Sequence, residues 1–297
     1  MNTVTIDAAP SAAGAPGSAG APAATRRPTA LESNLAVTFP RVMRSEWIKL
    51  RTVRSIVITL LASMVVVIGI GILATSIKSG DIATPRGRPA GGPPGFGSDP
   101  TAVSLAGVQL AQMIVAIVGV ILVTSEYVTG SIRATLAAVP RRLPVLFAKV
   151  TVFAVTVFVI EIVAVLVAFL AGQAILGNVG VSLGDAGVLA AVIGAALTIT
   201  GMGLIGVAFG FLFRSTAGGI AVTIAVFFIV PVLINIFSTS VKNAVNPYLP
   251  SSAAASLANV TPLPHYLTYW PALLLMIGWV VVFVVAAAIR MMRSDAN

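Results

Sequence analysis

The chain has 297 residues, of which 58% are hydrophobic and 9% are charged. Soluble domains carry about 25% charged residues, so a water-soluble globular protein is excluded and an integral membrane protein is predicted. The net charge of +9 does not indicate nucleic-acid binding, because the basic residues lie in short segments between apolar runs and not on one folded face. With no cysteine and a single histidine, the chain has no thiol chemistry and little with which to bind a metal.

The first 40 residues are rich in Ala, Gly, Pro and Ser and contain few large apolar side chains. Such a segment cannot bury enough surface to offset the entropy lost on ordering. We therefore expect residues 1–40 to form a disordered tail and residues 41–293 to form one membrane domain.

The segment from Arg41 to Arg54 predicts an amphipathic helix that lies at the membrane surface before the first span. Met43, Trp47 and Leu50 share one helical face. The cations of the segment can reach anionic lipid headgroups; they include Arg44, Lys49, Arg51 and Arg54. Glu46 has two interpretations: an ion pair with Lys49 three positions on, which we favour, or a polar contact with a cytoplasmic partner.

Six apolar runs follow, and they predict an all-α, polytopic membrane protein. The first run covers 22 residues without a charge, which corresponds to about 33 Å of helix against a hydrocarbon core of about 30 Å. The predicted spans are approximately 56–77, 102–123, 145–170, 188–211, 220–237 and 272–289.

The distribution of Lys and Arg predicts the orientation. Fourteen of the 18 basic residues lie on the side of the N-terminus and four on the other side, if all six runs cross the membrane. Because basic residues are concentrated in cytoplasmic segments, we expect both termini in the cytoplasm of a multi-pass protein of the cell membrane.

A few residues within the spans call for explanation. Glu161 lies in the third run, where an ionisable group normally faces the bundle interior. It could contact a substrate or an ion, or it could join helices as a hydrogen-bonded carboxyl, with Gln109 and Gln112 of the second run as partners. Gly206 and Gly210 have the spacing that permits close helix packing. A further pair, Pro231 and Asn235, predicts a kink or break in the fifth run.

On the side of the N-terminus, the longest polar, charged interval between two spans is TSEYVTGSIRATLAAVPRRLPVLFAK, residues 124–149. Ser131 is a plausible N-cap of a short helix. Ile132, Leu136 and Val139 would share its apolar face, with Arg133 beside them, until Pro140 ends it. A short helix with an apolar face, held between two spans, indicates a docking partner.

This chain contains no GxxxxGK[ST] phosphate-binding loop, and no HExxH or GxSxG motif that would support a hydrolase. We therefore expect a membrane subunit that is not an enzyme, with an energy source in another protein.

Two motifs, SEWIKLRTVRS before the first span and SEYVTGSIRATLAAVPRRLPVLFAK after the second, resemble the permease subunits of type-2 ATP-binding cassette (ABC) exporters, in the form common in high-GC Gram-positive bacteria. The resemblance covers approximately residues 41–293. It implies that the segment before the first span is a connecting helix and that the loop between spans two and three is a coupling helix, which inserts into a separate ATPase subunit. That ATPase would bind ATP and Mg, and a second permease copy or a homologous permease would complete the translocation path.

The resemblance also implies roles for individual residues. The residues at or beside the coupling helix are Glu126, Tyr127, Gly130, Ile132, Arg133 and Leu136; those on the connecting helix are Arg44, Glu46, Trp47, Lys49 and Arg51. Two alternatives remain open. An ion-coupled secondary transporter would use Glu161 as its protonation site, and a membrane anchor or regulator would transport nothing.

Overall fold

A computed structural model describes residues 38–80, 99–132 and 142–293 of the chain. Most of the predicted N-terminal tail, most of the segment between the first two predicted spans and most of the predicted docking helix therefore lie outside the described residues. Within the described ranges every regular element is a helix and no strand occurs. The predicted all-α class is confirmed.

Six helices are long and apolar enough to cross a membrane, and they occur where the sequence predicts them. The protein is a multi-pass membrane protein. The spans are α3 (Arg54–Ser79), α5 (Val108–Val128), α7 (Arg142–Leu176), α8 (Val188–Phe213), a fifth span that begins with α9 (Thr216–Ile224), and α13 (Tyr269–Arg293). The shorter helices are α2 (Phe39–Thr52), α4 (Pro100–Ser104), α11 (Thr239–Val245), α12 (Pro250–Leu257) and the 3-10 turns η1 (Gly177–Val179) and η3 (Asn246–Tyr248).

Helix α8 is the centre of the bundle, and it contacts α5, α7, α9, α12 and α13. Its packing against α5 depends on glycine: a Cβ at Gly206 would overlap the carbonyl group of Ala116, and a Cβ at Gly210 would crowd Val123. The predicted close packing at Gly206 and Gly210 is confirmed. Without side chains at these positions the two backbones approach closely, as is common between membrane helices.

The second span differs from the prediction at both ends. The chain forms α4 first, turns through Leu105 and Gly107, and only then begins α5 at Val108. A Cβ at Gly107 would overlap the backbone of Val67, so the turn is packed directly on α3. At its other end α5 continues to Val128, five residues beyond the predicted span.

The fifth span contains the break that Pro231 and Asn235 predict. Helix α9 passes into a π-helix, η2 (Ala225–Ile229), and then into α10 (Val230–Ile234), which ends at Asn235. Pro231 has no N–H to donate, so the regular α-helical ladder cannot continue through it. The Asn235 side-chain amide donates to the Pro231 carbonyl at 2.9 Å.

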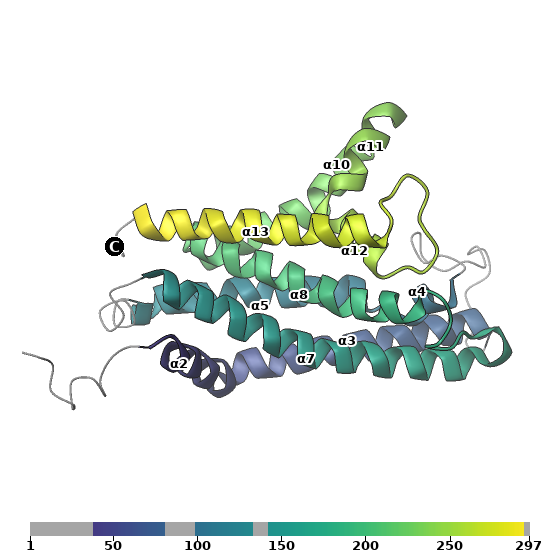
Figure 1. The fold of residues 1–297 in the computed structure, drawn as a ribbon, viewed down its shortest axis with the longest axis horizontal. Coiled ribbons are helices and arrows are strands. Elements are labelled where there is room, and N and C mark those ends of the chain that lie inside the picture. Colours follow the sequence, from purple (N-terminus) through teal and green to yellow (C-terminus); the bar gives the residue numbers. More distant parts are fainter. Residues whose placement is uncertain (1–37, 81–98, 133–141, 294–297) are drawn as a thin grey trace, which may run out of the picture. The chain divides into compact units, whose positions relative to one another are not determined.

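The bundle has two ends, which we call the α2 end and the α4 end. Helix α2 and the C-terminal end of α13 lie at one, and α4 lies at the other (Figure 1). Because the spans alternate in direction, the end of α5, the start of α7 and the turn between α8 and α9 are also at the α2 end. Helix α7 has 35 residues, or about 52 Å, so it extends beyond a hydrocarbon core of about 30 Å.

Candidate functional site

The most concentrated group of charges in the described residues lies at the α2 end. Helix α2 buries Val42, Glu46 and Leu50 against the bundle, mainly against α7. Glu46 is 3% exposed. The predicted apolar face of this helix is therefore displaced: Leu50 is buried, but Trp47 is exposed.

Glu46 belongs to a closed ring of alternating charges. The Lys149 ammonium lies 2.5 Å from Glu46 Oε2 and 2.9 Å from Glu126 Oε1. The Lys49 ammonium lies 2.8 Å from Glu46 Oε1 and 3.2 Å from Glu126 Oε1. Two cations and two anions thus cancel, and each cation bridges both carboxylates. The expected pair of Glu46 with Lys49 is confirmed, and we call the four residues the ion-pair ring.

Burial and neighbouring charges shift the pKa values of Glu46 and Lys49 in opposite directions. Burial disfavours the charged form of Glu46, but the attraction and hydrogen bonds of Lys149 and Lys49 outweigh it, so the pKa of Glu46 is lowered below 4.5. For Lys49, burial is likewise outweighed by the two carboxylates, and its pKa is raised above 10.5. The stabilisation from Glu46 is present above pH 4.5 and is lost as the pH falls through its lowered pKa, whereas that from Lys49 is lost only as the pH rises through its raised pKa. Glu46 and Lys49 are therefore both charged across neutral pH.

The ring joins three elements that are remote in sequence. Glu46 and Lys49 come from α2, Glu126 from the last turn of α5, and Lys149 from the second turn of α7. The segment 133–141, which includes most of the predicted docking helix, connects α5 to α7. The residues that precede and follow this segment are consequently tied to each other and to α2 by buried ion pairs.

The last turns of α5 also contact the turn between α8 and α9. The Thr216 hydroxyl donates to the Thr124 hydroxyl at 2.8 Å. The Arg214 guanidinium lies 5.3 Å from the centre of the Tyr127 ring, a distance typical of a cation–π contact. Arg214 adopts a left-handed backbone conformation, with φ of 52°, and ends α8. Movement of the α5 end would thus act on both α2 and the α8–α9 turn.

The other residues expected at the coupling helix are only partly described. Glu126 and Tyr127 lie on α5, not in a loop after it. The chain then turns at Gly130, with φ of 70°, and Ile132 is 3% exposed. Arg133 and Leu136 lie outside the described residues, so the docking helix itself remains a prediction.

Glu161 does not meet the partners predicted for it. The Ser63 hydroxyl of α3 donates to Glu161 Oε1 at 2.5 Å, and the carboxyl group is fully enclosed between α3 and α7. Neither Gln109 nor Gln112 bonds to it. The two glutamines are on α5, which packs chiefly on α8, while Glu161 faces α3, so the expected three-residue polar site is not formed.

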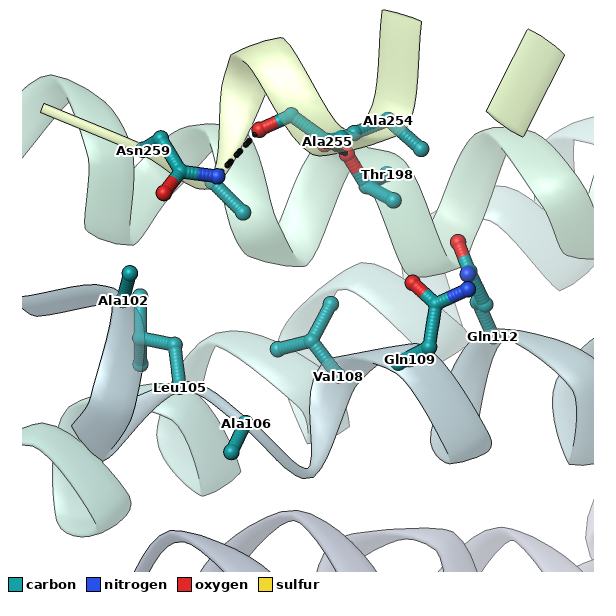
Figure 2. A pocket seen from close by; sticks show the side chains of 11 residues that line it. Ala102, Leu105, Ala106, Val108, Gln109, Gln112, Thr198, Ala254, Ala255 and Asn259 are labelled. Carbon is teal, nitrogen blue, oxygen red and sulfur yellow. Dashed lines mark hydrogen bonds between the residues drawn. The ribbon is translucent and has the colours of Figure 1, made fainter. Parts of the chain in front are cut away.

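Gln109 and Gln112 instead line a small cavity of about 80 Å³ between the start of α5, α8 and the end of α12. Their side chains point from α5 toward the wall that carries Thr198, and Asn259 lies at the other end of the cavity, across from Ala102 (Figure 2). Gln112 Oε1 is buried and has no hydrogen-bond partner among the described residues. The cavity lining carries amides, a hydroxyl and small apolar groups but no charge.

The sequence pattern did not reveal the ion-pair ring. The sequence indicates only that Lys149 contributes to the charge bias that predicts orientation, whereas in the structure it is 1% exposed and contacts both carboxylates. Its position offers a signal: a lysine at the start of an apolar span needs a counter-ion if it is buried, and Glu126, at the end of the preceding span, lies at the same end of the bundle.

Comparison of the chain with models of known protein families and with curated proteins found no match.

Proposed function

We propose that this protein is the membrane-spanning permease subunit of an ABC exporter of the type-2 class. It would lie in the cell membrane with both termini in the cytoplasm and form the translocation path with a second permease. A separate subunit would bind ATP and Mg and hydrolyse the nucleotide. The chain itself would be a transport subunit and not an enzyme.

The observation that best supports this proposal is the set of contacts around the loop between α5 and α7. A docking segment can drive a bundle only if its two ends are tied to helices that must move. Here the ion-pair ring ties both ends of the loop to α2, and Thr124 and Tyr127 tie one end to the α8–α9 turn. ATP-dependent movement of a docked partner would thus reach several helices and bias the bundle between two states.

The environment of Glu161 favours this proposal over ion-coupled transport. A protonation site on a transport path must exchange with water, but Glu161 is enclosed between two helices and bonded to Ser63. A carboxyl group in that position is suited to joining α3 to α7. The proposal therefore assigns Glu161 a structural role.

A reconstituted system tests the proposal. The chain would be co-expressed with a candidate ATPase subunit, one with a phosphate-binding loop encoded next to it, and the complex placed in proteoliposomes. We expect the permease to stimulate ATP hydrolysis, and Arg133→Glu to reduce the stimulation at least about tenfold while the chain still inserts. Ile132→Asp is a poorer choice, because Ile132 is buried and the change would also disturb packing.

The matched control is Lys242→Glu, which reverses a charge on α11, on the opposite side of the membrane from the loop in the proposed topology. It should leave the stimulation unchanged. Stimulation by Arg133→Glu equal to that of the unmodified chain would contradict docking at this loop, and absence of a stable complex with the ATPase would contradict the proposal as a whole.

A further inference from the structure

The face of α2 opposite the ion-pair ring is exposed, and its composition is unusual. It carries Arg44, Trp47, Ile48 and Arg51, and Arg54 follows at the start of α3. Trp47 is 44% exposed and Ile48 is 50% exposed. Large apolar side chains thus alternate with guanidinium groups on one surface.

Because the ring takes up the acidic residue of α2, every charged group of α2 on this face is a cation. Glu46 is the only acidic residue of α2, and it points inward, where Lys149 and Lys49 neutralise it. No carboxylate of α2 is left to compensate Arg44 and Arg51. The burial of one acid therefore concentrates the net positive charge of the helix on its outer face.

The position of α2 places this face at a membrane surface. Helix α2 ends at Thr52, the backbone is extended at Val53, and the 26-residue span α3 begins at Arg54. A helix joined to a span by a single residue cannot move far from the headgroup layer. Tryptophan favours that layer, and arginine is attracted by anionic lipids there.

We propose that the outer face of α2, formed by Arg44, Trp47, Ile48, Arg51 and Arg54, docks on anionic phospholipid headgroups. Trp47 and Ile48 insert between lipids, and the guanidinium groups bind phosphates. The anionic leaflet then holds α2 from outside while the ion-pair ring holds it from inside. This inference uses the chain alone and does not rest on the proposed transport function.

Trp47 can report on the lipids around it. The chain has three tryptophans, so Trp270→Phe with Trp279→Phe leaves Trp47 as the only one. The full-length variant would be placed in nanodiscs of mixed phosphatidylcholine and phosphatidylglycerol, with bromine on the acyl chains of one lipid or the other at equal mole fraction. We expect brominated phosphatidylglycerol to quench Trp47 at least about twofold more strongly than brominated phosphatidylcholine.

Replacement of the three arginines, Arg44→Gln, Arg51→Gln and Arg54→Gln, should bring the two quenching values together. The matched control, Arg290→Gln with Arg293→Gln, removes exposed charge at the same end of the bundle and should preserve the difference. Retention of Trp fluorescence and of the thermal midpoint would show that the variants are folded.

Two results would overturn the proposal. Equal quenching of Trp47 by both brominated lipids, in the variant that keeps all three arginines, would mean that α2 touches the membrane without selecting for headgroup charge. Quenching by neither lipid would mean that the face meets water or a protein partner, and acrylamide, a water-soluble quencher, would distinguish these two.

Discussion

At the scale of single residues, Lys149 is the most consequential side chain in the structure. It is almost fully buried, yet it is charged and contacts two carboxylates from different helices. Removing one partner of a buried ion pair leaves the other charge without compensation, which costs far more than the pair itself contributes. The ion-pair ring is therefore a strong constraint on how α2, α5 and α7 are arranged.

We predict that Lys149→Met destabilises the protein by about 3–5 kcal/mol, because Glu46 and Glu126 would then share Lys49 alone. The double change Lys149→Met with Glu46→Gln leaves one carboxylate and one ammonium, and it should be less destabilised than Lys149→Met. The measurement is the midpoint temperature of thermal unfolding in detergent, monitored by tryptophan fluorescence.

The control for this pair of variants is Arg44→Met, which removes a cation from the exposed face of the same helix and should change the midpoint little. If the double variant were less stable than Lys149→Met, Glu46 and Lys149 would not be coupled, and the ring would not act as a unit.

Sequence reasoning succeeded for residues whose partner lies on the same helix and failed for those whose partner lies elsewhere. The contact between Glu46 and Lys49 follows from helical spacing alone. The contacts of Lys149 with Glu46 and of Glu161 with Ser63 depend on which helices are neighbours, and a single sequence does not encode that in any local pattern. For the same reason the sequence does not show that Gln109 and Gln112, the possible partners of Glu161, line a cavity elsewhere.

At the scale of helices, the glycines of α5 and α8 determine how closely these spans pack. A Cβ at Gly206 would overlap the Ala116 carbonyl, which is backbone and cannot rotate away. Apolar periodicity identifies the two spans, and the glycine spacing indicates that one of them packs closely. The identity of the neighbouring helix is not contained in that spacing.

We predict that Gly206→Ala forces α5 and α8 apart and destabilises the protein by about 1–3 kcal/mol, the usual cost of overpacking. The matched control is Gly278→Ala on α13, where a Cβ would have no atom within 4 Å. This change should leave the stability of the protein unaltered. Both variants would be compared by thermal midpoint. Equal stability of the two would show that the close approach of α5 and α8 is not required.

Helix boundaries were harder to predict than helices. The α4–α5 break follows from a glycine packed on the backbone of Val67, a tertiary contact within an otherwise continuous apolar run. By contrast, the break in the fifth span follows from Pro231, whose missing N–H acts locally and is visible in the sequence.

At the scale of the whole molecule, hydropathy gives the six spans, and charge gives their expected direction. The spans are observed. Their direction across the membrane rests on the positive-inside bias, because fourteen of the 18 basic residues lie in segments that the sequence assigns to the side of the N-terminus. The proposals for the docking loop and for the ATPase both require this end to be cytoplasmic.

Because the chain contains no cysteine, single cysteines can report this direction without further substitutions. Ala186→Cys lies in the exposed turn between α7 and α8, and Met292→Cys is exposed at the end of α13. We expect a membrane-impermeant maleimide to label Ala186→Cys in intact cells, and to label Met292→Cys only after the cells are opened. Labelling of Met292→Cys in intact cells would reverse the orientation, and the loop between α5 and α7 would then face away from any cytoplasmic ATPase.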